Sequence, residues 1–265
     1  MQINVIAEKI IGIIKDAGKI ILDAEAAENS VSEKYGSANF VTKYDVAVQN
    51  FLIENITKIL PDAYFYAEEK ENDADIEKLE YCFIIDPIDG TANFINGYRH
   101  SSISVALYSF GKALFGAVYN PYQDEMFSAT AGGGAFLNGK PIHVSDRPIE
   151  RSIVAFGTSP YYKDTLSDNT FAILKELFLI ANDVRRLGSA ALDLAYFAAG
   201  RNDIFFECVL QLWDIAAACL IVKEAGGEVT DLNGNPLSVK SSTPVLAVSQ
   251  RLKPLVLEIT KKYAR

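Results

Sequence analysis

The chain has 265 residues, of which 49% are hydrophobic and 22% charged, and its formal net charge at pH 7 is −9. Such a chain can build one large core or two closely packed halves, its apolar runs are too short to span a bilayer, and its negative charge without a basic run argues against a nucleic-acid polymer as partner. Three cysteines without a Cys-x-x-Cys pair are typical of reduced thiols in the cytoplasm and argue against a structural zinc site.

The N-terminal region predicts two helices and then a short strand. In the first ~30 residues, charged side chains interrupt the apolar run at helical spacing, which indicates an amphipathic helix rather than a signal peptide. Residues Val46 to Leu60 predict the second helix, and the run DAYFY from Asp62 to Tyr66 predicts a strand.

From Tyr81 the pattern changes to short alternating runs that predict an antiparallel meander. Asn-Gly pairs at Asn96 and Asn138 punctuate these runs as turns. The segment Gly134 to Lys140 also fits the G-x-x-x-x-G-K part of a phosphate-binding loop. Pro141 then stands where that loop needs Ser or Thr, so an Asn-Gly hairpin turn is the better interpretation.

The C-terminal part alternates predicted helices with short strands. A soft boundary near Asp146 to Arg151 separates an N-terminal half, residues 1–147, from a C-terminal half, residues 148–265, within a single unit. Helices lie between two blocks of predicted strands, which indicates stacked α and β layers rather than a barrel.

One stretch, YCFIIDPIDGTANF from Tyr81 to Phe94, combines a predicted buried strand with two acids. Pro87 restricts its own φ and disfavours the helical region for Asp86, so we expect Asp86 to end the strand and Pro87 to open a turn. The carboxylates of Asp86 and Asp89 would then lie close together in that turn. Two such carboxylates repel each other unless a hard cation lies between them.

Gly90 and Thr91 follow the two acids, where a helix start or tight turn would present backbone N–H groups to an anion. Carboxylates for Mg²⁺ beside amides for a phosphate form a coherent pair, because an acidic protein needs metal ions to offset its own charge at a phosphate site. The simpler alternative is that Asp86 and Asp89 are turn and helix-capping residues.

Three other acidic positions allow the same two interpretations. Glu68 and Glu69 follow the predicted strand DAYFY, either as a ligand site or as a solvated pair. Asp214 begins the predicted helix WDIAAA, where a carboxylate also favours the helix dipole. Asp45, three residues after Thr42, precedes the second helix and is also readable as a cap.

Three spaced motifs together resemble the inositol monophosphatase-like, Mg²⁺-dependent phosphatases over essentially the whole chain. DPIDGTANF is similar to the family signature D-P-[IL]-D-G-T-x-N-F, and WDIAA followed by EAGG is similar to its W-D-x-A…E-A-G-G signature. AEEK resembles the family segment G-E-E-[ST], with Ala67 in place of Gly and Lys70 in place of the small hydroxyl residue. The resemblance implies an α+β fold, the layered αβαβα sandwich of the sugar phosphatases, and a homodimer.

The resemblance also implies two Mg²⁺ sites as the cofactor centre. Glu68, Asp86 and the Ile88 carbonyl would hold the first ion. Asp86, Asp89 and Asp214 would hold the second. No covalent nucleophile is expected, because no cysteine begins a Cys-x₅-Arg motif and the acids of the DPIDG stretch do not follow the Asp-x-Asp-x-Thr order of aspartyl-phosphate enzymes.

For catalysis, the resemblance implies that Thr91, hydrogen-bonded to Asp45, orients the attacking water together with Glu68. The substrate itself would contact Asp89, Gly90, Thr91, Gly188, Ser189, Ala190 and Glu207. Plain helix initiation remains the alternative for Gly188 to Ala190. Lys34 matches a basic loop that lies near the site in this family.

The predicted function is Mg²⁺-dependent hydrolysis of a small phosphorylated polyol or sugar, with myo-inositol 1-phosphate as the first choice of substrate. Fructose-1,6-bisphosphatase activity, alone or as a dual activity, is the alternative, followed by a nucleotide 3′-phosphatase. A different class is a regulatory family member that binds a sugar phosphate or a partner such as a ribosomal particle. Such a member would be expected to lose at least one metal ligand.

Overall fold

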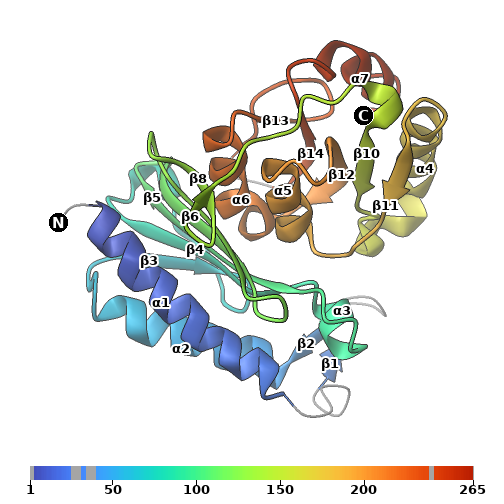
Figure 1. The fold of residues 1–265 in the computed structure, drawn as a ribbon. Helices are drawn as coiled ribbons and strands as arrows, with labels where there is room; N and C mark the ends of the chain where they lie inside the picture. The colour runs from blue at the N-terminus through green and yellow to red at the C-terminus, as the bar shows by residue number, and fades with distance from the viewer. Residues whose placement is uncertain (1–2, 25–30, 34–39, 239–241, 265) are drawn as a thin grey trace.

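The structure, a computed structural model, describes residues 3–24, 31–33, 40–238 and 242–264 (Figure 1). The helices are α1 Ile3–Leu22, α2 Lys43–Thr57, α3 Thr91–Ile95, α4 Lys163–Phe178, α5 Ala190–Ala198, α6 Leu212–Glu224 and α7 Lys253–Thr260. The strands are β1 Val31–Glu33, β2 Phe40–Thr42, β3 Tyr64–Ala67, β4 Cys82–Asp89, β5 Ser102–Ser109, β6 Lys112–Asn120, β7 Glu125–Thr130, β8 Gly134–Leu137, β9 Lys140–Pro141, β10 Ile153–Phe156, β11 Asp183–Arg185, β12 Ile204–Leu210, β13 Glu228–Thr230 and β14 Thr243–Val248. Among these residues, no helix is long and apolar enough to cross a membrane.

Two sheets form the framework, and each is built from one half of the chain. The seven-stranded sheet runs β3-β4-β5-β6-β7-β8-β9 and is antiparallel except for the β3–β4 pair. The five-stranded sheet runs β11-β10-β12-β14-β13. The predicted meander is therefore confirmed, and Asn138 and Gly139, both with positive φ, form the tight turn between β8 and β9.

The elements stack in five layers, αβαβα, as expected (Figure 1). Helices α1 and α2 cover one face of the seven-stranded sheet, and α5 and α6 lie between the two sheets. Helices α4 and α7 cover the outer face of the five-stranded sheet. Gly116 in β6 lets α6 approach closely, because a Cβ there would lie 2.5 Å from the Ala217 carbonyl oxygen. This contact brings the start of α6 against the sheet that carries β4.

The prediction that Asp86 ends a strand is wrong, because the strand continues beyond this residue. Strand β4 continues through Pro87 to Asp89, and all eight of its residues are buried. Asp86 pairs with Ser104 and Asp89 with Ser102, so β4 contains one more residue than β5 over this interval, which is a β-bulge. A bulge tolerates Pro87 because the missing N–H is not needed for the ladder.

Two helix boundaries also differ from the prediction. Helix α1 ends at Leu22 rather than near residue 30, immediately after Ile21, the last residue of its buried stripe. Helix α2 begins at Lys43, three residues before the predicted start, because Thr42 and Asp45 form a capping box. Lys34, which the resemblance places in a loop near the site, lies outside the described residues.

Candidate active site

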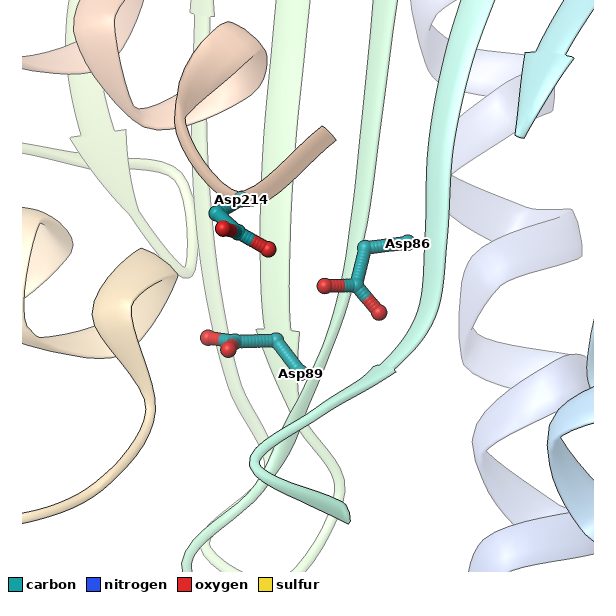
Figure 2. Close-up of side chains that lie close together, drawn as sticks. All are labelled: Asp86, Asp89 and Asp214. Atoms are coloured by element: carbon teal, nitrogen blue, oxygen red, sulfur yellow. The ribbon is translucent and has the colours of Figure 1, made fainter. Parts of the chain in front are cut away.

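Three aspartates from distant parts of the chain meet in one pocket of about 550 Å³. Figure 2 shows Asp86 and Asp89 on β4 facing Asp214 at the start of α6. One carboxylate oxygen from each residue lies within 4.8 Å of the other two. The sequence predicted that these carboxylates converge, and the structure brings them together.

The bulge in β4 explains how Asp86 and Asp89 come to share one side of the strand. In a regular strand, residues three apart point to opposite faces, because side chains alternate with a period of two. The extra residue between Asp86 and Asp89 reverses that alternation. The backbone N–H of Ile88 donates to Asp86 Oδ1 at 3.1 Å, which holds the first carboxylate in place.

The carboxylate of Asp89, the last residue of β4, contacts the N-terminus of α5. Its Oδ2 accepts hydrogen bonds from Ser189 Oγ at 2.5 Å and from the Ala191 backbone N–H at 2.8 Å. Ser189 is also the N-cap of α5, since its hydroxyl accepts from the Leu192 N–H. The helix start therefore stabilises a negative charge at Asp89, and the predicted helix initiation at Gly188 to Ala190 is confirmed.

Asp214 is both a capping residue of α6 and a member of the cluster of three aspartates. It occupies the third position of α6, where its Oδ2 accepts from the Gln211 backbone N–H at 2.7 Å. The two interpretations of this residue are therefore compatible, because a carboxylate has two oxygens and the cap engages one of them.

Asp45 divides its two oxygens in a similar way. Oδ2 accepts from the backbone N–H of Thr42 at 2.8 Å and from its hydroxyl at 2.6 Å, which closes the capping box of α2. Oδ1 faces the Thr91 hydroxyl, which lies 3.5 Å away and also 3.1 Å from the Ile88 carbonyl. The predicted contact between Thr91 and Asp45 is thus present at the long end of the hydrogen-bond range.

Two glycines allow the β4–α3 loop and the loop before α5 to approach each other. Gly90 has φ +89°, and a Cβ on it would lie 3.0 Å from the Gly188 carbonyl oxygen. Gly188 has φ +92°. The Asn93 side-chain amide joins the two loops by donating to the His100 and Leu187 carbonyls, both at 2.7 Å. This bracing sets the distance between the acidic cluster and the start of α5.

Glu207 lines the same pocket from the five-stranded sheet. It sits within β12, where the register with β14 shifts. Its Oε1 accepts from the backbone N–H of Ser159 at 2.8 Å and from the Ser159 hydroxyl at 3.2 Å. Gly157 makes room for this carboxylate, because a Cβ there would lie 1.8 Å from Glu207 Oε2. Burial raises the pKa of Glu207 to about 7.

Comparisons with known proteins show the family of the chain. The sequence model of the inositol monophosphatase family matches residues 3–265. The chain belongs to this family. A Nus factor SuhB of Pasteurella multocida is 36% identical over 250 residues, which cover 92% of each chain, and an inositol-1-monophosphatase of Mesorhizobium japonicum is 35% identical over 86% of this chain and 85% of the relative. The crystal structure of the extragenic suppressor protein suhB from Bartonella henselae superposes with a TM-score of 0.89 at 34% identity, covering 96% of this chain and 98% of that one.

Membership of the inositol monophosphatase family supports phosphatase activity and metal binding, and the residues of this chain suit a metal. Six carboxylates line the pocket, and Arg186 is the only basic side chain among the described residues of its wall. Burial, followed by the negative charges of Glu68, Asp89 and Asp214, raises the pKa of Asp86 well above its usual range. Buried carboxylates that repel one another in this way favour a hard divalent cation such as Mg²⁺.

Glu68 and Ile88 are placed beside the cluster rather than within it. Both line the pocket, and the backbone N–H of Glu68 donates to the Ile85 carbonyl at the end of the β3–β4 pair. Glu68 is not one of the three residues whose oxygens lie within 4.8 Å of one another. Lys70, which departs from the family segment, places its ammonium 4.8 Å from the centre of the Tyr64 ring.

We predict that the chelated protein loses stability as pH rises from about 4 to about 7. Burial raises the pKa of Asp45 and of Asp89 to about 6 and of Glu207 to about 7, so the folded state binds more protons than the unfolded state in this range. The stability that these protons contribute is present below the unfolded pKa values and is lost as pH rises through the folded ones.

Thermal unfolding with a chelator across this pH range measures the effect. Added Mg²⁺ should flatten the dependence, because it stabilises the ionised carboxylates in the folded state. A chelated protein whose melting temperature rises with pH would contradict the prediction.

Several pocket residues were not predicted from the sequence, among them Gly157, Ser159 and Asp193. Ser159 has φ +43° and is held by Glu207, a contact between segments 48 residues apart that no local pattern reveals. Asp193 did have a local signal, because it lies four residues after Ser189, on the same face of the predicted helix.

Proposed function

We propose that this protein hydrolyses a small phosphomonoester in an Mg²⁺-dependent reaction, with myo-inositol 1-phosphate as the substrate. The observation that carries the proposal is the convergence of Asp86, Asp89 and Asp214 in a pocket that also contains Thr91 and Glu207. Membership of the inositol monophosphatase family and the relative named inositol-1-monophosphatase support it.

Asp86, Asp89, Asp214, Glu68 and the Ile88 carbonyl are the groups that would hold Mg²⁺. When bound, Mg²⁺ would supply Lewis-acid activation of water and would neutralise the negative charge of the phosphate and the leaving group. Without such neutralisation, the acidic wall of this pocket would repel a phosphate dianion.

Thr91 and Asp45 would position the attacking water together with Glu68. The Thr91 hydroxyl lies between Asp45 Oδ1 and the Ile88 carbonyl, and Asp45 is buried and held by Thr42. A hydroxyl fixed in this way can accept a hydrogen bond from a water molecule while it donates to one of these oxygens. The backbone amides of Gly90 and Thr91 would receive phosphate oxygens.

The leaving group would extend towards α5 and β12. There Gly188, Ser189 and Ala190 border the pocket at the start of α5, and Glu207 lines it from the five-stranded sheet. One Glu207 oxygen is engaged by Ser159, and we propose that the carboxylate also accepts a hydroxyl of the polyol. A homodimer is part of the proposal on the family resemblance, and its mass in solution would test that part.

A phosphate-release assay with Mg²⁺ tests the proposed function. It should compare inositol 1-phosphate, fructose 1,6-bisphosphate, a nucleotide 3′,5′-bisphosphate and an aryl phosphate, with Asp89→Asn as the inactive control. The highest kcat/KM is expected for inositol 1-phosphate. A preference for fructose 1,6-bisphosphate or for the nucleotide would assign the enzyme to that substrate instead, and no release from any substrate would refute the phosphatase.

A role limited to partner binding is the second candidate, because several relatives carry the name Nus factor SuhB. The presence of Glu68, Asp86, Asp89 and Asp214 together favours the enzymatic function, since a protein that only binds a partner does not need them.

Glu207→Gln should separate recognition of the leaving group from the chemistry. The Gln side-chain oxygen can keep the two Ser159 hydrogen bonds, whereas the negative charge and one acceptor are lost. We expect the ratio of kcat/KM for inositol 1-phosphate to that for an aryl phosphate to fall about tenfold or more. Equal losses on both substrates would show that Glu207 supports the structure or the metal site.

A further inference from the structure

Asp193 is a buried acid in the pocket wall that has no part in the reaction proposed above. It lies in the first turn of α5, is only 1% exposed, and lines the same pocket as Asp89 and Glu207. Its Oδ1 has no hydrogen-bond partner among the described residues. Leaving a buried carboxylate oxygen without a partner costs free energy, so this arrangement calls for an explanation.

Asp203 shows what a structural buried aspartate looks like in this protein. It is also 1% exposed, yet Oδ1 accepts from Ser145 Oγ at 2.6 Å and from Arg147 Nε at 2.8 Å. Its Oδ2 accepts from the Ile153 N–H at 2.7 Å. Asp203 therefore joins Ser145 and Arg147, at the end of the N-terminal half, to Ile153 in the C-terminal half. Asp193 has no comparable set of donors among the described residues.

Capping of α5 does not account for Asp193 either. The cap is Ser189, whose hydroxyl accepts from the Leu192 N–H, and Asp89 accepts from the Ala191 N–H. The backbone N–H of Asp193 itself donates to the Ser189 carbonyl as an ordinary helical bond. The donors of the first turn are thus already used, and the Asp193 side chain is left to face the pocket wall.

The surroundings of Asp193 fit a neutral ligand that carries hydroxyl groups. Burial, followed by the negative charges of Glu207 and Asp89, raises the pKa of Asp193 well above its usual range, and Arg186 acts in the opposite direction. A hydroxyl both donates and accepts, so it is complementary to an ionised carboxylate and to a protonated one. A second phosphate at this wall would instead meet the charges of Glu207 and Asp193.

We propose that Asp193 is a specificity-determining residue that receives a hydroxyl of the leaving group beside Glu207, and thereby selects monophosphates of neutral polyols. This inference rests on the proposed function and refines its substrate class. Because Asp193 Oδ1 has no donor among the described residues, it supplies acceptor capacity that a ligand hydroxyl would satisfy.

The test compares Asp193→Ala and the shape-matched Asp193→Asn with Asp203→Asn, in which the altered aspartate lies outside the pocket. We expect Asp193→Ala to lower the ratio of kcat/KM for inositol 1-phosphate to that for an aryl phosphate at least about tenfold, and Asp193→Asn to restore part of it. Asp203→Asn should lower the melting temperature and leave the ratio unchanged. An unchanged ratio in Asp193→Ala, or in Asp193→Asn if the alanine variant does not fold, would overturn the inference.

A binding measurement separates this inference from the proposed function. With Mg²⁺ and inorganic phosphate present, free myo-inositol should raise the melting temperature of the wild-type protein and should lose that effect in Asp193→Ala. The shift caused by Mg²⁺ and phosphate alone should remain in the variant. If the wild type hydrolyses an aryl phosphate but myo-inositol produces no shift, or if the variant keeps the shift, Asp193 does not recognise the polyol although the phosphatase assignment stands.

Discussion

Replacing Asp89 by asparagine should lower kcat about a thousandfold, because the loss of a proposed Mg²⁺ ligand would remove several kcal/mol of transition-state stabilisation. The fold should persist. The Asn oxygen can accept from Ser189 Oγ and the Ala191 N–H in place of Asp89 Oδ2. Asp89 repels the carboxylates of Asp86 and Asp214, so its neutralisation should leave the melting temperature of the chelated protein unchanged or higher.

Turnover at saturating Mg²⁺ and the melting temperature with a chelator measure the two parts of this prediction. Asp203→Asn is the matched control, because Asp203 is also buried but forms an ion pair with Arg147 at 2.8 Å. It should lose stability and keep its turnover, the reverse of Asp89→Asn. If Asp89→Asn kept a turnover close to that of the wild type, the proposed role of Asp89 as a metal ligand would be wrong.

Thr91→Ala should reduce kcat about a hundredfold while KM for the substrate changes much less. The hydroxyl lies 3.1 Å from the Ile88 carbonyl and 3.5 Å from Asp45 Oδ1, a position that suits the orientation of water rather than the binding of substrate. The loss of an interaction that is made mainly in the transition state lowers kcat and leaves KM nearly unchanged.

Steady-state kinetics at several Mg²⁺ concentrations distinguish this role from metal binding. Thr260→Ala is a suitable control, because its buried hydroxyl also donates to a backbone carbonyl, that of Leu232 at 2.7 Å, but in the outer helical layer. That variant should lose some stability and no turnover. If KM for substrate and for Mg²⁺ absorbed the whole effect of Thr91→Ala, the water-positioning role would be wrong.

The capping alternatives for Asp45 and Asp214 show how local and functional roles coexist. From the sequence, each residue could be a helix cap or part of the functional site, and the structure contains the helix cap in both cases. Each cap uses Oδ2, which leaves Oδ1 of Asp45 for Thr91 and an oxygen of Asp214 for the acidic cluster. A helix start with a cap holds its carboxylate in a fixed orientation, so the cap helps to build the site.

The β4 strand shows what the sequence could not predict. Pro87 between two acids indicated a turn, whereas the structure has a bulged strand that continues to Asp89. The difference arises because the bulge is defined by pairing with β5, and the register of β5 depends on the whole meander. Both geometries bring the two carboxylates together. The prediction that Asp86 and Asp89 lie close to each other is therefore confirmed, although the predicted backbone conformation was wrong.

By itself, the sequence determined the stacking of α and β layers, the meander and the identity of the acids, because these depend on periodicity, turn residues and short motifs that are local in the chain. The five-layer αβαβα order was implied by the resemblance to the family. Only the tertiary structure decided that Asp214 reaches Asp86 and Asp89 and that Ser189 caps α5 while it holds Asp89. It also placed Asp193 in the pocket wall, with no partner for Oδ1 among the described residues. These relations join segments about 100 residues or more apart. They depend on the register of β4 and on the close approach of α6 at Gly116, and neither can be read from a local pattern.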